Sequence, residues 1–134
     1  MPKLYVFRGL PGSGKSTAAR ALSAELGIVL VEPDMFCIHD GKYDYSVDRW
    51  YASLSTARSM LHGLSLVGCD IIYADVLPRK QNVLDLLDAL VAPDTYILTV
   101  YDHKCTVDES LKRNKHNVRA QDIRAMAEAW EDWQ

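Results

Sequence analysis

The sequence lacks a long hydrophobic run, a close pair of cysteines and a stripe of basic residues, and each absence excludes a class of protein. No apolar run approaches the roughly 18 residues that a membrane-spanning helix needs, and no secretory hydrophobic segment follows Met1. We therefore expect a cytoplasmic protein that does not contact a membrane.

The cysteines are widely spaced, since Cys37, Cys69 and Cys105 form no CxxC pair. Structural zinc sites and dithiol redox sites need cysteines at close spacing, so neither is expected. An odd number of cysteines in a cytoplasmic chain favours free thiols. His39 and His62 also lack metal-ligand spacing to another histidine, cysteine or acid, and we interpret them as surface or packing residues.

Positive charge is scarce, and the formal net charge is −3 at pH 7. Proteins that hold duplex DNA by its backbone carry a basic stripe, whereas the basic residues here gather only within residues 112–116. Any contact with nucleic acid is therefore expected to be small, with one strand end rather than a long duplex.

The composition is that of an ordinary globular domain, with 49% hydrophobic and 25% charged residues among 134. This length is typical of one domain, and no repeat, low-complexity segment or linker divides it. Residues 1–134 are therefore predicted to form a single domain.

Apolar runs alternate with helical patterns along the chain. The expected strands cover residues 4–7, 28–31, 71–74 and 96–101. The expected helices cover residues 15–26, 46–67, 78–90, 106–112 and 120–133. Gly27 is an expected carboxyl-terminal cap, Ser46 and Thr106 are expected amino-terminal caps, and residues 32–45 are predicted as a loop.

This alternation predicts an α/β fold, with a four-stranded parallel sheet flanked by helices on both faces. Ligands of such sheets bind outside the carboxyl ends of the strands. Function is therefore expected in residues 9–16, 33–45, 75–79 and 102–106.

Residues 9–16 read GLPGSGKS and match the P-loop pattern G-x-x-x-x-G-K-[ST] at every fixed position. The segment lies between an expected strand and an expected helix, as the pattern requires. Its glycines let backbone N–H groups converge on phosphate oxygens, and the following helix adds its positive end. The predicted nucleotide-binding residues are Gly9, Pro11, Gly12, Ser13, Gly14, Lys15, Ser16 and Thr17.

Within the P-loop, Lys15 is expected to reach the β- and γ-phosphates and to act in catalysis, and Thr17 to contact the α-phosphate. The Ser16 hydroxyl is an expected Mg²⁺ ligand. Asp75, after the third strand, is a second candidate that would hold the metal through a water, although a capping or turn role stays open because many strands end in Asp. The expected cofactors are ATP or GTP together with Mg²⁺.

Asp34 stands just past the second strand, in a loop that the topology places near the P-loop. A carboxylate there can accept the proton of an attacking hydroxyl during phosphoryl transfer, so Asp34 is the predicted catalytic base. Glu32 is the second candidate, and a plain turn role for Asp34 is the alternative.

Four basic residues lie between the last two helices: Arg113, Lys115, His116 and Arg119. They can form a mobile lid that closes over the phosphates, and Arg113 is the predicted catalytic residue of this lid. The alternative is a solvated turn between the two helices. Four aromatic residues lie in or near the start of the long helix: Tyr43, Tyr45, Trp50 and Tyr51. They have two interpretations, a stacking surface for a base or packing of the helix against its preceding loop.

The P-loop in the form GLPGSGKST, the Asp34 loop, residues 40–45 (DGKYDY), Asp75 with Arg79, and Arg113-Asn114 resemble the polynucleotide-kinase-type P-loop kinases. That family includes the kinase domains of phage polynucleotide kinases and related AAA-type ATP-binding proteins, with zeta toxins as more distant relatives. The resemblance covers essentially the whole chain. It implies a parallel four-stranded sheet, Asp34 as the base, a basic lid near Arg113, and transfer of the ATP γ-phosphate to a hydroxyl, often a 5′-hydroxyl of a nucleic acid.

The chain departs from this family in three places. An acceptor-binding arginine of the phage kinases, three positions after the base, is replaced by Cys37. Residues 73–76 (YADV) keep only the acid of an Asp-Asn-Thr-type motif, and residues 115–118 (KHNV) lack the later arginine and glycine of the lid.

Taken together, the sequence predicts an enzyme, a phosphotransferase with an alcohol group as acceptor. The nucleoside triphosphate is its expected donor, and a nucleic-acid end or nucleotide-like molecule is its expected acceptor. Two alternatives stay open: a kinase of a small metabolite or modified base, which the negative net charge and Cys37 favour, and a non-catalytic ATP-binding regulatory module.

Overall fold

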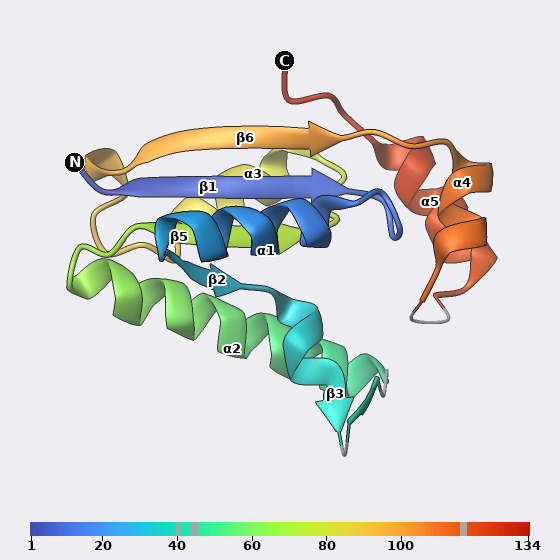
Figure 1. Ribbon diagram of the computed structural model, residues 1–134, viewed down its shortest axis with the longest axis horizontal. Helices are drawn as coiled ribbons and strands as arrows, with labels where there is room; N and C mark the ends of the chain where they lie inside the picture. Colours follow the sequence, from blue (N-terminus) through green and yellow to red (C-terminus); the bar gives the residue numbers. More distant parts are fainter. Residues whose placement is uncertain (40, 44–45, 116–117) are drawn as a thin grey trace.

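A computed structural model describes residues 1–39, 41–43, 46–115 and 118–134, and its centre is a four-stranded parallel sheet (Figure 1). The strands follow the order β2 (Val29–Val31), β5 (Ile71–Asp75), β1 (Lys3–Gly9) and β6 (Ile97–His103). Because β1 is central and parallel to β5 and β6, its carboxyl end opens between theirs. The predicted α/β fold is confirmed.

Helices cover both faces of the sheet, with α1 (Lys15–Leu26) on one face and α2 (Val47–Leu66) and α3 (Lys80–Leu87) on the other (Figure 1). The pleat explains this division, because successive side chains of a strand point to opposite faces. Val6 and Tyr73 pack in the cluster that includes Leu61 of α2, whereas Phe7 and Ile72 pack with Ala19 of α1.

The remaining helices lie beyond the carboxyl ends of the strands. Figure 1 shows α4 (Val107–Arg113) and α5 (Ala120–Ala129) past the arrowheads of β1 and β6. The predicted capping box begins α4, since the Thr106 hydroxyl accepts from Glu109 N and the Glu109 carboxylate accepts from Thr106 N, both at 3.1 Å. Ser46 and Gly27 also cap their helices as predicted, and a short 3₁₀ helix, η2 (Pro93–Thr95), precedes β6.

The segment predicted as a loop after β2 contains regular structure. A 3₁₀ helix, η1 (Pro33–Cys37), begins at a proline, which is favourable at the first helical position. A two-residue antiparallel pair follows, β3 (Ile38–His39) with β4 (Lys42–Tyr43), and Gly41 turns between them with φ 76°. These elements are too short to show a sequence period, so the pattern of residues 32–45 did not indicate them.

Three helix ends also differ from the prediction. The third long helix runs from Lys80 to Leu87 rather than over residues 78–90, and Leu77 before it has a left-handed φ of 48°. The last helix ends at Ala129 rather than Trp133, because the backbone of the tail hydrogen-bonds elsewhere: Glu131 N donates to Pro78 O at 2.8 Å and Trp133 N to Asp102 Oδ2 at 3.0 Å. Within the described ranges, every helix is too short or too polar to cross a bilayer.

Candidate functional site

The P-loop lies between β1 and α1, as predicted, and its geometry demands glycine. Gly12 and Gly14 have φ of 77° and 93°, in the left-handed region that residues with a Cβ rarely adopt. A Cβ at Gly9 would collide with the Ser13 hydroxyl and would lie 2.6 Å from the His103 carbonyl oxygen. These residues form a tightly curled turn at the amino terminus of α1.

This turn fits a phosphate group. The Ser13 Oγ is buried and has no hydrogen-bond partner among the described residues, which is costly unless a ligand supplies one. Lys15 is only 7% exposed although it carries a charge, and no carboxylate of the described residues pairs with it. A bound phosphate would satisfy both groups, because it offers hydrogen-bond acceptors and negative charge.

An open cleft of about 1080 Å³ extends from the P-loop across the carboxyl ends of β1 and β5. It brings together most of the residues that the sequence singled out. Those lining it are Pro11, Gly12, Gly14, Lys15, Ser16, Thr17, Asp34, Asp75, Arg113, Lys115 and Arg119. His116 lies outside the described residues.

Asp75 ends β5 at the floor of the cleft and is 7% exposed. Its Oδ1 accepts a hydrogen bond from Val76 N at 2.8 Å. Burial, and next the negative charge of Asp34, raise the pKa of this carboxyl to about 7, while Lys15 acts in the opposite direction. A divalent cation would favour the charged form, so this carboxyl is electrostatically suited to a metal that arrives with a nucleotide.

The described residues contain no group of three His, Cys, Asp or Glu side chains that would hold a metal on its own. Mg²⁺ in nucleotide sites is commonly held by one or two protein oxygens, phosphate oxygens and waters. Ser16 and Asp75 line the same cleft and supply protein oxygens of this kind.

Asp34 faces the cleft from η1 and is held by a hydrogen bond. The Tyr43 hydroxyl donates to its Oδ1 at 3.0 Å. Burial, followed by the charge of Asp34, raises the pKa of Tyr43, so this phenol stays protonated as a donor. One carboxylate oxygen of Asp34 is therefore engaged, and no described residue donates a hydrogen bond to the other.

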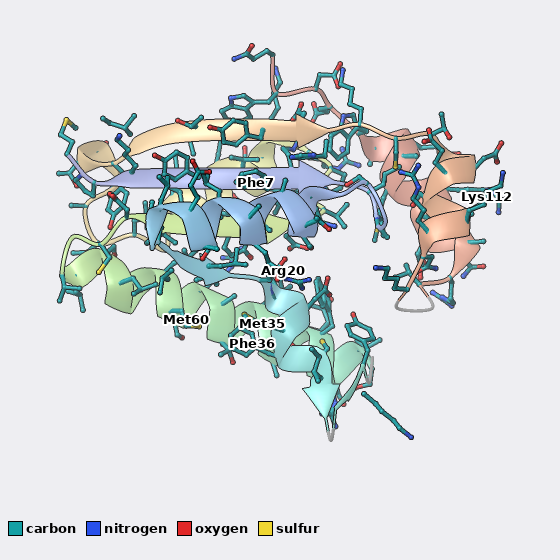
Figure 2. The ribbon with its side chains drawn as sticks, viewed as in Figure 1. Phe7, Arg20, Met35, Phe36, Met60 and Lys112 are labelled. Atoms are coloured by element: carbon teal, nitrogen blue, oxygen red, sulfur yellow. The ribbon has the colours of Figure 1, made fainter. Side chains whose placement is uncertain are left out.

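Glu32, the second candidate base, does not line the cleft. It is 4% exposed, and its carboxylate pairs with Arg20 of α1 at 3.3 Å. Figure 2 shows Arg20 between α1 and the segment that carries η1. The geometry therefore favours Asp34 over Glu32 as a proton acceptor.

The basic segment begins on a helix that is docked on the P-loop. Ser110 of α4 is fully buried, and its hydroxyl donates to the Pro11 carbonyl at 2.6 Å. A Cβ at Gly12 would lie 2.6 Å from the Arg113 Cβ, which places the root of the Arg113 side chain directly against the P-loop. Lys112 of the same helix points away from the sheet (Figure 2).

The ends of the basic side chains are engaged with neighbours. Arg113 pairs with Glu109 at 3.4 Å, and Arg119 pairs with Asp122 at 2.9 Å. The Asn114 side chain donates to Val118 O at 2.6 Å and accepts from Val118 N at 3.2 Å, which holds these two residues together. The Arg113 guanidinium is thus held beside its own helix, with a side chain that is more than half exposed.

Other residues divide between the cleft and the core. Tyr43 and Trp50 line the cleft, whereas Tyr51 is 66% exposed and does not; Tyr45 lies outside the described residues. Cys37 is buried, with its Sγ 3.2 Å from the Ser53 hydroxyl. The position that holds an arginine in the phage kinases therefore presents nothing to the cleft.

Sequence reasoning missed Arg8, which is fully buried one residue before the P-loop. Its guanidinium donates to Leu77 O at 2.9 Å, Pro78 O at 3.0 Å, Glu131 O at 2.8 Å and Asp102 Oδ1 at 3.1 Å. It also lies 4.1 Å from the centre of a ring of Trp130. The available signal was a charged residue directly after the apolar run of residues 4–7. Arg8 ties the strand that carries the P-loop to β6 and to the last residues of the chain.

All three cysteines, Cys37, Cys69 and Cys105, are free, as predicted.

Comparison with known proteins agrees with this architecture. A family model described as an AAA domain matches residues 4–134. A chain of the Pnkp1/Rnl/Hen1 RNA repair complex is 20% identical with a TM-score of 0.75, over 96% of this chain and 43% of that one. The present chain thus spans less than half the length of that relative.

Two metabolite kinases share the fold as well. A sugar kinase from Janibacter sp. HTCC2649 is 15% identical with a TM-score of 0.71, over 100% of this chain and 80% of that one. A gluconokinase from Sinorhizobium meliloti 1021 is 15% identical with a TM-score of 0.63, over 98% and 75%. Identities this low establish a common fold, and the family match over nearly the full length establishes more: the chain belongs to the AAA-domain family of P-loop proteins.

Proposed function

We propose that this protein is a kinase that transfers the γ-phosphate of ATP or GTP, with Mg²⁺, to a hydroxyl group of a nucleic-acid end or a nucleotide-like molecule. The observation that carries the proposal is that Asp34 lines the same cleft as Lys15 and Arg113. A proton acceptor thus shares one cleft with two cations, which is the combination that phosphoryl transfer to a hydroxyl requires.

The donor half of the cleft would hold the triphosphate by its backbone and by charge. The curled P-loop would supply N–H groups, and Lys15 would neutralise the β- and γ-phosphates. Ser16 would hold the metal directly, and Asp75 would hold it through a water. When bound, the nucleotide would supply the phosphoryl group, and the metal would supply positive charge that offsets the negative charge of the phosphates. The surrounding residues fix their position, which provides most of the acceleration in this class of reaction.

The acceptor half would remove a proton. Asp34 takes the proton of the acceptor hydroxyl through its second carboxylate oxygen as that hydroxyl oxygen bonds to phosphorus and the bond to the β-phosphate oxygen breaks. The hydrogen bond from Tyr43 orients the carboxylate. Arg113, once released from Glu109, neutralises charge on the transferred group.

Two observations support a base-containing acceptor. The aromatic side chains of Tyr43 and Trp50 line the cleft together with Asp34, and aromatic faces stack on bases. The repair-complex relative is also associated with RNA. The second candidate, a kinase of a small metabolite, is favoured by the burial of Cys37, which leaves the cleft without the arginine of the phage kinases at that position.

Incubation with γ-labelled ATP and Mg²⁺ tests the proposal, with 5′-hydroxyl oligonucleotides, nucleosides and sugars as acceptors. We expect label on an oligonucleotide or nucleotide, loss of transfer in Asp34→Asn with ATP binding retained, and loss of ATP binding in Lys15→Ala. Asp88→Asn, on the exposed end of α3, is the matched control for the charge change.

The other outcomes distinguish the kinase from its two alternatives and test Asp34 as the base. Label on no acceptor, with tight ATP binding, would establish the regulatory module and refute the kinase. Label on sugars alone would establish the metabolite kinase. Undiminished transfer by Asp34→Asn would remove Asp34 as the base.

A further inference from the structure

Arg8 connects two strand ends that flank the cleft. It directly precedes Gly9, the first residue of the P-loop, and its Nε donates to the Leu77 carbonyl at 2.9 Å, two residues after Asp75. One guanidinium thus ties the strand that carries the P-loop to the strand that carries the candidate metal carboxylate. Arg8 does not line the cleft, so it acts on the site only through the backbone of these strand ends.

The turn after Asp75 has a conformation that needs support. Leu77 has a left-handed φ of 48°, the only positive φ of a residue other than glycine in the described ranges. A residue with a Cβ keeps this unfavourable conformation only where its surroundings hold it. Leu77 is buried in the core next to α2 and α3, and Arg8 binds its carbonyl. Weakening this hydrogen bond would allow the turn to relax and Asp75 to shift.

Residues 130–133, which we call the clasp, complete the surroundings of Arg8. The Glu131 carbonyl accepts from Arg8 Nη2 at 2.8 Å, and a ring of Trp130 has its centre 4.1 Å from the guanidinium carbon. Figure 1 shows this segment leaving α5 and turning back beside β6. The clasp therefore reaches the cation that supports the nucleotide site, and it does so from outside the cleft.

The clasp is joined to the fold mainly through its backbone and belongs to no helix or strand. Glu131 N donates to Pro78 O at 2.8 Å, and Trp133 N donates at 3.0 Å to Asp102, the carboxylate that pairs with Arg8. Short segments outside regular structure open locally at a lower free energy than the core does. The clasp can thus open while the sheet stays folded.

Opening of the clasp and binding in the cleft act on the same strand ends. An open clasp takes one acceptor and an aromatic ring from Arg8 and admits water to the guanidinium, which weakens its hold on Leu77. A Mg²⁺-nucleotide on the P-loop and Asp75 would fix those strand ends from the other side. Two events that favour the same arrangement of the backbone favour each other, and to the same extent.

We propose that Arg8 is a positioning residue for the nucleotide site and that the clasp controls it, because docking of the clasp and binding of a Mg²⁺-nucleotide strengthen each other. The inference rests on the donor half of the proposed function and is independent of the acceptor. Withdrawal of the clasp would weaken the hold of the cleft on its nucleotide.

Hydrogen exchange in the wild-type chain tests this coupling without substitution or turnover. The backbone amides of Glu131 and Trp133 are followed with and without Mg²⁺ and a non-hydrolysable ATP analogue. We expect both amides to exchange about tenfold more slowly in the complex, and the slowing to be smaller when Mg²⁺ is omitted. The matched control is the Val91 amide, which donates to Ser65 Oγ outside the cleft and should be unaffected.

Two full-length variants disturb the clasp in different ways. Arg8→Lys keeps the charge but loses the fork that reaches four acceptors, and Trp130→Leu removes the ring beside the guanidinium. Calorimetry should show a Kd for the Mg²⁺-bound analogue that is about tenfold higher in each variant, with a smaller change when Mg²⁺ is omitted. Leu61→Ala, in the core under α2 and outside the cleft, is the control for lost stability. It should lower the melting temperature but leave the Kd unchanged at a temperature at which every chain is folded.

Unchanged exchange of both clasp amides on binding of the Mg²⁺-bound analogue would overturn the proposal. A Kd that neither variant changes would also overturn it, as would a Kd that Leu61→Ala raises equally, since the effect would then be one of general stability. If neither variant folds, exchange in the wild type decides alone. A coupled clasp in a chain that phosphorylates no acceptor would refute the kinase and leave the clasp standing, whereas a wild type that binds no nucleotide would overturn both.

Discussion

The buried carboxyl of Asp75 makes the stability of the nucleotide-free protein depend on pH in an unusual direction. Its folded-state pKa is raised to about 7 from an ordinary value of 3.8, first by burial and then by the charge of Asp34. The unfolded chain therefore loses this proton at lower pH than the folded chain does. Stability is fully present below about pH 4 and falls as the pH rises toward 7, until the folded form is also ionised.

The magnitude follows from the shift. Each pKa unit corresponds to about 1.4 kcal/mol, so ionised Asp75 destabilises the fold by on the order of 4 kcal/mol at pH 8. Asp75→Asn removes the charge and retains an oxygen that can accept from Val76 N. We expect this variant to gain about 3 to 4 kcal/mol over the wild type between pH 4 and pH 8.

Urea unfolding at both pH values, without nucleotide or Mg²⁺, measures this difference. Asp88→Asn is the matched control, because Asp88 is exposed and its replacement should give no comparable pH-dependent gain. The same Asp75→Asn variant should lose Mg²⁺-dependent turnover. A stability difference between wild type and Asp75→Asn that is equal at pH 4 and pH 8 would refute the reasoning.

Three further predictions concern the contacts around the P-loop. Gly12→Ala should lower the free energy of unfolding in urea by about 2–4 kcal/mol, because its Cβ would collide with Arg113. Gly14→Ala has a φ of 93° but no atom within 4 Å of its Cβ, so only backbone strain remains, and the loss should be about 1–2 kcal/mol. Equal losses would show that the contact with α4 is absent. Arg8→Met should destabilise by about 3–5 kcal/mol in thermal or urea unfolding, because it removes the donor that serves a partly buried carboxylate and three carbonyl oxygens. A loss below about 1 kcal/mol would contradict the role of this network. Ser110→Ala should lower turnover without changing the KM for ATP, and in a double-mutant cycle it should add little to Arg113→Ala, since it acts by placing that arginine; full additivity would refute this.

The parts of the structure that were predictable are those encoded by neighbouring residues. The P-loop is recognised because phosphate geometry fixes the spacing of its glycines and Lys15, and the sheet because apolar runs are short and regularly separated. Asp34 and Asp75 were singled out for the same reason, since parallel strands deliver the residues that follow them to one edge. The structure brings both to one cleft, and their catalytic and metal-binding roles stay predictions.

The parts that were not predictable depend on partners distant in sequence. The Ser110 hydroxyl meets a carbonyl 99 residues away, and nothing near Ser110 in the sequence signals that contact. The end of α5 was misplaced because tertiary hydrogen bonds of the tail outweighed a helical pattern that continued to Trp133.

The Arg8 network has a consequence for the order in which this protein forms. During synthesis, Arg8 precedes one of its hydrogen-bond partners, Glu131 O, by 123 residues. Until then, burial of β1 encloses a cation whose partners are incomplete, which opposes stable closure of the sheet. The phosphate-binding turn that follows Arg8 is therefore expected to settle only after synthesis has passed residue 131, so nucleotide binding reports that the fold has closed.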